Sequence, residues 1–244
     1  PASQIEVVEP WAEAREALRK NYGIEAQAEA GPALQRAQIV VWAVKPQTFR
    51  DAAAQAKAHT QGALHLSVAA GIRSDSIAQW LGTERIVRTM PNTPALVGKG
   101  MSALYARPAV SAPERQSIEA IMATTGEFLW VDSEPQLDAV TALSGSGPAY
   151  VFYFLEAMTR AGTGMGLTEQ QAHQLAVGTF VGASELARRS DDPPSVLRQR
   201  VTSKGGTTYA ALQSMEAAGV AASFEAAMRA AQHRAHELGD EFGA

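Results

Sequence analysis

The chain of 244 residues contains no cysteine. This excludes disulfide bonds, thiolate nucleophiles and zinc sites built on cysteine, and it fits a reducing compartment, so we expect a cytoplasmic protein. No apolar run is long enough to cross a membrane, and no block of lysine or arginine is present. Because the net charge is −4, we expect neither a nucleic-acid partner nor a membrane.

Two further kinds of site are missing from the pattern. The five histidines are isolated or lack an acidic neighbour at metal-ligand spacing, so we predict no metal site. No serine, histidine and aspartate combination indicates nucleophilic catalysis. What the chain does have is 46% hydrophobic and 19% charged residues, which is typical of a globular protein with a full core in one large domain or two ordinary ones.

Residues 1–132 alternate short β-rich runs with helical patterns. Strands are expected at 5–8, 39–44, 63–67, 85–88, 101–105 and 127–131. The continuous apolar run at 39–44 favours a strand buried on both faces, and the alternation predicts a parallel, doubly wound α/β sheet of the Rossmann type. We therefore expect a dinucleotide-binding domain over residues 1–132.

Residues 133–244 show no strand pattern. Helices are expected at 135–143, 148–162, 168–189, 194–200, 207–217 and 220–238. Several carry large apolar residues on more than one face, as at 151–158, and a helix that is apolar all round must be buried. An all-α domain this small cannot bury them alone, so we expect a second subunit to do so.

The usual glycine-rich dinucleotide loop, Gly-x-Gly-x-x-Gly after a first strand, is not found near the start. Glu9 follows the strand expected at 5–8, where an acidic residue at the end of a second strand would accept the cofactor's ribose hydroxyls. On this interpretation the first strand and glycine loop lie upstream of Pro1. The alternative is that Glu9 is a surface acid before a helix, and the residues alone favour neither.

Three other features were weighed for ligand binding. Ser144-Gly-Ser-Gly147 has no buried strand before it and no following lysine, so a close-packed helix junction is favoured over a phosphate loop. Val201-Thr-Ser-Lys-Gly-Gly-Thr-Thr208 leads into a helix, and its glycines favour an anion site over ordinary capping. Lys45 follows a buried strand, where ligands bind in such sheets, although a solvated lysine at a strand end is the default interpretation on local evidence.

Six stretches together resemble the pyrroline-5-carboxylate reductase family. They are Ala43-Val-Lys-Pro-Gln47, Ser67-Val-Ala-Ala-Gly71, Arg88-Thr-Met-Pro-Asn-Thr-Pro94, Asp138-Ala-Val-Thr-Ala-Leu-Ser-Gly-Ser-Gly-Pro-Ala-Tyr150, Gly164-Met-Gly-Leu167 and Ser203-Lys-Gly-Gly-Thr-Thr208. The resemblance implies an N-terminal dinucleotide-binding domain, a helical dimerisation domain over 133–244, and a dimer or a dimer-based assembly such as a decamer. It implies reduction of 1-pyrroline-5-carboxylate to L-proline by NADPH or NADH.

The resemblance also implies roles for individual residues. Cofactor contacts are expected at Glu9, Val44, Lys45, Pro46, Ala69, Ala70 and Asn92. Substrate contacts are expected at Val201, Ser203, Gly205, Gly206, Thr207 and Thr208, with the Thr208 hydroxyl at the ring nitrogen as the catalytic group. A carboxylate at Glu9 would repel a 2′-phosphate, which favours NADH.

Two alternatives remain open at this point. One is a related reductase of the β-hydroxyacid type, although such enzymes use a lysine in the helical domain and Lys204 lies in a loop, where many relatives carry proline. The other is an inactive oligomeric fragment without a cofactor loop.

Overall fold

A computed structural model describes residues 2–243. The chain divides into two compact units. The first, the sheet unit, contains the residues up to Gly145 together with those from Ala231 onward, and the second, the helical unit, is Ser146–Ala230. The domain boundary between 132 and 133 stays a prediction.

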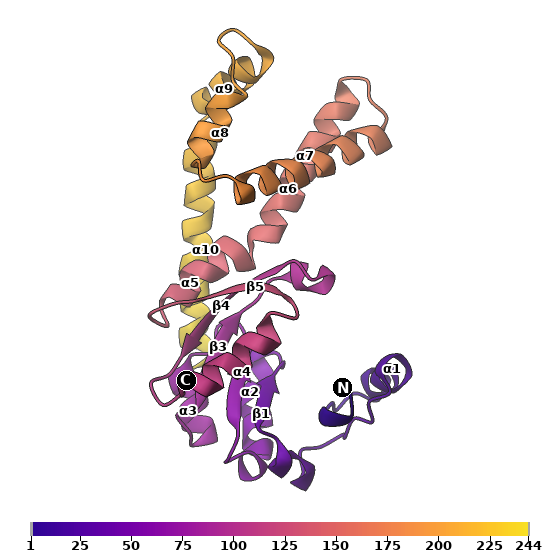
Figure 1. The fold of residues 1–244 in the computed structure, drawn as a ribbon, viewed down its shortest axis with the longest axis vertical. Helices are drawn as coiled ribbons and strands as arrows, with labels where there is room; N and C mark the ends of the chain where they lie inside the picture. The colour runs from indigo at the N-terminus through magenta and orange to yellow at the C-terminus, as the bar shows by residue number, and fades with distance from the viewer. Residues whose placement is uncertain (1, 244) are drawn as a thin grey trace. The chain divides into compact units, whose positions relative to one another are not determined.

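A five-stranded sheet forms the centre of the sheet unit (Figure 1). Its strands lie in chain order: β1 (Ile39–Trp42), β2 (Leu64–Ser67), β3 (Ile86–Met90), β4 (Gly100–Ala106) and β5 (Gly126–Trp130). Strands β1, β2 and β3 are parallel, but β4 pairs with β3 in antiparallel register, with Thr89 opposite Leu104. The prediction of an all-parallel sheet was therefore wrong at this pair, while the Rossmann-like class with a mostly parallel sheet is confirmed.

Helices cover both faces of the sheet. On one face α2 (Pro46–Ala56) and α3 (Ser74–Leu81) pack over a core that includes Trp42, Phe49, Ile77 and Ile86. On the other face α4 (Ala112–Met122) covers a second core of Leu66, Val87, Leu104 and Ile118, among others. Helix α4 begins with a capping box, in which the Ser111 N–H and hydroxyl both donate to Glu114.

Two expectations about the first strands were wrong. Residues 5–8 lie between a 3-10 helix (Ala2–Gln4) and α1 (Ala12–Tyr22) and form no strand of the sheet. Val8 makes a single bridge with Gln27, which follows α1. Strand β1 is not buried on both faces, because the Val41 side chain is exposed. It also lies at the edge of the sheet among the described strands. An isolated bridge satisfies few main-chain groups, so this segment gains little from strand pairing.

The C-terminal part of the chain is helical, as predicted. The sheet unit contains α5 (Gln136–Val140), a π-helical turn (Thr141–Gly145) and the last turns of α10 (Val220–Phe242). The helical unit contains α6 (Gly147–Gly164), α7 (Glu169–Arg189), α8 (Pro194–Arg200), α9 (Thr207–Ala217) and the start of α10. Helices α6 and α7 approach closely at Gly162, where an added Cβ would lie 2.8 Å from the Ala172 Cβ.

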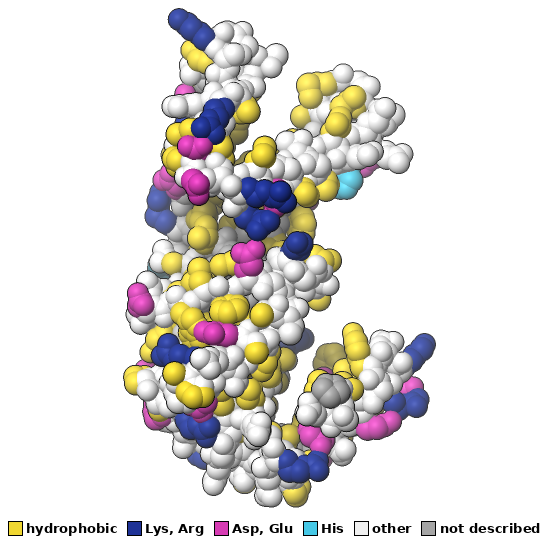
Figure 2. All heavy atoms as spheres, viewed as in Figure 1, with side chains coloured by type: hydrophobic (Ala, Val, Ile, Leu, Met, Phe, Trp, Pro, Cys, Tyr) yellow, Lys and Arg dark blue, Asp and Glu magenta, His cyan; other side chains and the backbone are white. Residues whose placement is uncertain are grey.

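The helical unit exposes large apolar side chains. Figure 2 shows hydrophobic side chains at the surface of α6 and α7. Phe152 is 58% exposed, and Val181 is 66% exposed. In the turn from α6 to α7, Gly166 lies in the left-handed region and the Thr168 hydroxyl accepts a hydrogen bond from the Gln171 N–H.

Candidate active site

Three connections leave the sheet at the carboxyl ends of β1, β2 and β3. Because these strands are adjacent and parallel, their carboxyl ends lie along one edge of the sheet. The segments that follow carry Val44, Lys45 and Pro46, then Ala69 and Ala70, then Asn92. Every residue predicted to contact the cofactor except Glu9 is thus brought to the edge where dinucleotides bind in sheets of this kind.

The first connection turns directly into helix α2. Lys45 is the N-cap, in extended conformation, and Pro46 begins the helix, where the missing N–H leaves no unpaired donor. Val44 packs against the core, whereas the Lys45 side chain is exposed, with its Nζ 5.8 Å from the centre of the Trp11 ring. A cation at this distance is attracted to the ring face.

The second connection brings main chain close to the sheet edge. The Ala69 N–H donates to the Ser67 hydroxyl oxygen at 3.3 Å, and Ala69 is 5% exposed. Gly71 has a φ of +73°, and an added Cβ would lie 3.0 Å from the Leu238 Cβ. Only a glycine fits this close approach and left-handed backbone, and sequence reasoning left Gly71 without a role.

The third connection is braced by the Asn92 side chain. Its Nδ2 donates to the Ser144 carbonyl at 3.1 Å, and its Oδ1 accepts from the Met101 N–H at 2.9 Å. Because the oxygen and the nitrogen of this side-chain amide each form a hydrogen bond with main chain, Asn92 shapes the connection into the 3-10 helix η4 (Thr93–Val97). At Gly145 an added Cβ would lie 2.5 Å from the Met90 Cε, so the close-packed helix junction predicted there is confirmed.

Glu9 lies outside the sheet. Its carboxylate accepts from the Trp11 N–H at 2.9 Å, and its own N–H donates to the Gln27 carbonyl at 2.8 Å. These contacts match the interpretation of Glu9 as an acid before helix α1. Its role at the ribose, and the preference for NADH, stay predictions.

A second candidate region is the loop before α9 in the helical unit. The Gly206 N–H donates to the Ser203 carbonyl at 3.0 Å, and Gly205 has a φ of +77°, so these residues form a tight turn. Gly206 is the N-cap of α9, which has no side-chain capping bond. The Thr207 and Thr208 side chains are exposed at this helix start, where free N–H groups and the helix dipole favour an anion.

The remaining residues predicted to bind substrate belong to the same loop. Val201 follows α8, and it is exposed, as are Ser203 and Lys204. An added Cβ on Gly206 would lie 2.6 Å from the Ser203 Oγ, so this serine lies against the glycine. The predicted carboxylate-binding groups are therefore neighbours in one loop, and their contact with substrate stays a prediction.

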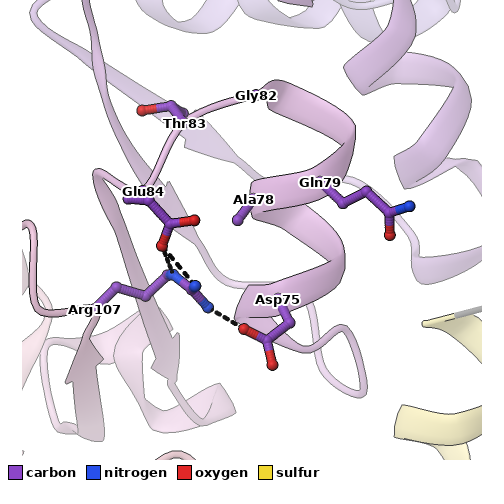
Figure 3. A pocket seen from close by; sticks show the side chains of 7 residues that line it. All are labelled: Asp75, Ala78, Gln79, Gly82, Thr83, Glu84 and Arg107. Atoms are coloured by element: carbon purple, nitrogen blue, oxygen red, sulfur yellow. Dashed lines mark hydrogen bonds and ion pairs between the residues drawn. The ribbon is translucent and has the colours of Figure 1, made fainter.

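A surface pocket of about 450 Å³ lies elsewhere on the sheet unit (Figure 3). Arg107 pairs there with Asp75 and Glu84, which leaves its charge compensated. None of the residues predicted to bind cofactor or substrate lines this pocket. Among residues 2–243 there is also no cluster of three or more acidic, histidine or cysteine side chains that could hold a metal ion.

The sheet contains a buried histidine and a buried arginine that the sequence left unassigned. His65 accepts a hydrogen bond from the Trp42 Nε1 at 3.0 Å. Burial lowers the pKa of His65 to about 4, although its hydrogen bond with the Thr60 main chain acts in the opposite direction. Arg88 pairs with Glu134 at 2.6 Å. Arg88 could have been noticed in the sequence, because it is a charged residue within the strand β3. A buried charge of this kind requires a partner.

The comparison with known proteins bears on both regions. A family model described as "Pyrroline-5-carboxylate reductase dimerisation" matches residues 134–238, and one described as "NADP oxidoreductase coenzyme F420-dependent" matches residues 2–71. A pyrroline-5-carboxylate reductase of Pseudomonas aeruginosa is 43% identical over the whole chain and 90% of its own length. The chain belongs to the pyrroline-5-carboxylate reductase family.

Solved structures of the family agree. The reductase of Coxiella burnetii is 35% identical, with a TM-score of 0.88 over 96% of this chain and 88% of its own. The reductase of Plasmodium falciparum, solved with NADP bound, is 29% identical, with a TM-score of 0.83 over 90% of this chain and 84% of its own. The family resemblance drawn from the sequence motifs is confirmed.

Proposed function

We propose that this chain reduces 1-pyrroline-5-carboxylate to L-proline with a hydride from NADPH or NADH. The observation that carries the proposal is the alignment of reductases of this name along essentially the whole chain, at up to 43% identity among those compared. The geometry supports it, because the sheet edge suits a dinucleotide and the loop before α9 suits a carboxylate.

The sheet unit would hold the cofactor. When bound, the nicotinamide supplies the hydride, and the residues of this chain position it. Val44, Lys45 and Pro46 would line it, Ala69 and Ala70 would lie against the nicotinamide, and Asn92 would shape the floor. The fit rests on the buried Ala69 and on the left-handed Gly71, which keep side chains away from that ring.

The loop before α9 would bind the substrate carboxylate. Ser203, Gly205, Gly206 and Thr207 offer a hydroxyl or main-chain N–H groups at a helix start without a side-chain cap, and Val201 would contact the ring. The Thr208 hydroxyl oxygen would accept a hydrogen bond from the protonated ring nitrogen and so orient it. The C=N carbon accepts the hydride, its π electrons pass to the already protonated nitrogen, and no further acid is required.

We infer that the working form is a homodimer or a multiple of it. The family model over residues 134–238 is a dimerisation model, and exposed apolar side chains such as Phe152 and Val181 need cover. No helix within residues 2–243 has the length and apolarity of a membrane span. A cytoplasmic location belongs to this proposal and rests on the missing cysteine.

The test is to mix the purified chain with 1-pyrroline-5-carboxylate and either NADPH or NADH. We expect cofactor absorbance to fall only when substrate is present, with one L-proline formed for each cofactor oxidised. Folded protein that oxidises neither cofactor would refute the proposal. A larger kcat/KM with NADPH would refute only the preference for NADH that Glu9 suggests.

A further inference from the structure

The connection from β2 to α3, residues 68–73, carries Ala69 and Ala70 and ends at an unusual helix start. Arg73 is the N-cap of α3 but makes no side-chain capping bond. Glu134, which lies 60 residues further along the chain, supplies that cap. The Ser74 N–H donates to Glu134 Oε1 at 2.6 Å, and the Ser74 hydroxyl donates to Oε2 at 2.5 Å.

The Glu134 carboxylate has a third donor in Arg88. The Arg88 Nη1 lies 2.6 Å from Glu134 Oε1, with both side chains largely buried at 9% and 17% exposure. Charged hydrogen bonds of this kind are stronger and more directional than neutral ones, particularly where solvent is excluded. One carboxylate therefore joins the end of this connection to strand β3, which leads to Asn92.

The last turns of α10 contact the same connection from another side. At Gly71 an added Cβ would lie 3.0 Å from the Leu238 Cβ, and Arg73 Nη2 lies 2.7 Å from Asp240 Oδ1. Next to these contacts, the Ser76 hydroxyl of α3 donates to the carbonyl of Gly243, which follows α10, at 3.0 Å. Glu134 and Leu238 are also the first and last residues matched by the dimerisation family model. Both ends of the dimerisation region thus fix the segment that carries the two alanines.

We propose that Glu134 is a positioning residue for hydride transfer, which holds Ala69 and Ala70 at the depth that the nicotinamide ring requires. This inference rests on the proposed function. Glutamine at 134 keeps one acceptor oxygen and replaces the other with an NH2 donor, so the bond from the Ser74 hydroxyl is lost or reversed and Arg88 loses its charged partner. The connection then shifts, and the shift alters the contacts of the nicotinamide but not those of the rest of the cofactor.

The chain offers a closely matched control. Glu114 accepts from a main-chain N–H and a hydroxyl, both of Ser111, and from the Arg85 Nε at 2.8 Å. The Arg85 Nη2 donates to it as well, so Glu114, like Glu134, joins one arginine to the N–H and hydroxyl of one serine. Arg85, however, lies just before β3, at the end opposite Asn92. Glu114→Gln should perturb a similar number of bonds without touching residues 68–73.

The experiment compares Glu134→Gln, Glu114→Gln and the wild type in the full chain. For Glu134→Gln we expect kcat to fall and the Kd for the preferred reduced cofactor to rise, each by about 10-fold or more, because small misplacement of reacting groups is costly. The Kd for the matching ADP-ribose fragment, which has no nicotinamide, should stay within 2-fold of wild type by the same reasoning. Glu114→Gln should keep all three values near wild type.

The outcomes separate this inference from the proposed function. Equal losses in both variants, or a fragment affinity that falls as much as that of the whole cofactor, would overturn the positioning role. Unchanged kcat and cofactor Kd in Glu134→Gln would overturn it as well. A wild type that binds cofactor but does not reduce 1-pyrroline-5-carboxylate refutes the proposed function alone, and the two binding constants then still decide the role of Glu134.

Discussion

The sheet unit and the helical unit bury their apolar residues very differently. In the sheet unit, large side chains such as Phe49, Ile77 and Ile86 are fully buried. Among the described residues of the helical unit, the buried positions are small ones, Gly162, Ala172 and Ala176, while Phe152 and Val181 face solvent. The sheet unit therefore has a core of its own, whereas the helical unit needs further apolar surface to complete one.

This difference separates two sources of stability. Packing inside the sheet unit belongs to one chain, so its contribution does not depend on protein concentration. Surface covered by a second copy contributes by mass action, so the stability of the helical unit should rise with concentration. Substitutions in each unit, measured at several protein concentrations, distinguish the two sources.

The largest effect is expected from Phe49→Ala in the sheet core. Phe49 is fully buried and its ring centre lies 5.0 Å from that of Trp42, so truncation should lower the free energy of unfolding by about 3–5 kcal/mol. Urea unfolding followed by fluorescence measures it. The loss should be the same at low and high protein concentration, and a strong concentration dependence would break the comparison.

The next effect concerns pH and His65. Burial places the pKa of His65 near 4 in the folded state, against 6.5 for the unperturbed side chain. As the pH falls from 6.5 to 4, the unfolded chain binds this proton first, so the free energy of unfolding should decrease by about 3 kcal/mol.

The measurement is urea unfolding at several pH values, for wild type and for His65→Gln, which removes the titrating group. The wild-type curve should drop more steeply between pH 6.5 and 4 than the variant curve. His233→Gln, at an exposed position, serves as the control and should follow the wild type. Parallel curves for wild type and His65→Gln would contradict the prediction.

Phe152→Asp should weaken self-association. If this side chain is covered by a second copy, a charge there should raise the dimer dissociation constant by about 30-fold or more. Sedimentation velocity at several concentrations measures it. Gln170→Asp, on an exposed polar position of α7, introduces the same charge and should leave association unchanged. Equal association of the two variants would place the interface elsewhere.

The smallest effect is expected from Thr208→Ala, which removes a hydroxyl from an exposed helix start. Stability should hardly change, while kcat/KM should fall by about 10-fold because one oriented hydrogen bond is lost in the transition state. Thr208→Ser keeps the hydroxyl and should restore most of the activity. An alanine variant with wild-type kcat/KM would remove Thr208 from the mechanism.

Much of the fold could be predicted because local signals were strong. Helices α8 and α9 have the predicted bounds, since proline and glycine mark where they begin. The antiparallel β4 did not follow from the predicted strand bounds, because residues 89–100 between them are a dozen, enough for a parallel crossover. In the structure, residues 91–99 between β3 and β4 are fewer than the dozen or so that a parallel crossover requires.

Other features depend on contacts that sequence spacing does not reveal. Residues 5–8 have a strand-like pattern, but a strand also requires a neighbour, and only Val8 finds one. The family motifs include Ala69 and Asn92, and the structure places both at the carboxyl ends of adjacent strands, while their contact with the cofactor stays a prediction. The bond from Glu134 to Ser74 joins residues 60 positions apart, and no local pattern predicts such a pair.

The most direct test of the central claim is sedimentation equilibrium of the wild-type chain over a wide dilution series, with thermal unfolding at each concentration. The account predicts a dimer or a multiple of it, and an unfolding temperature that rises with concentration. A monomer at every concentration, with a constant unfolding temperature, would contradict the claim that the helical unit obtains its core from a second copy.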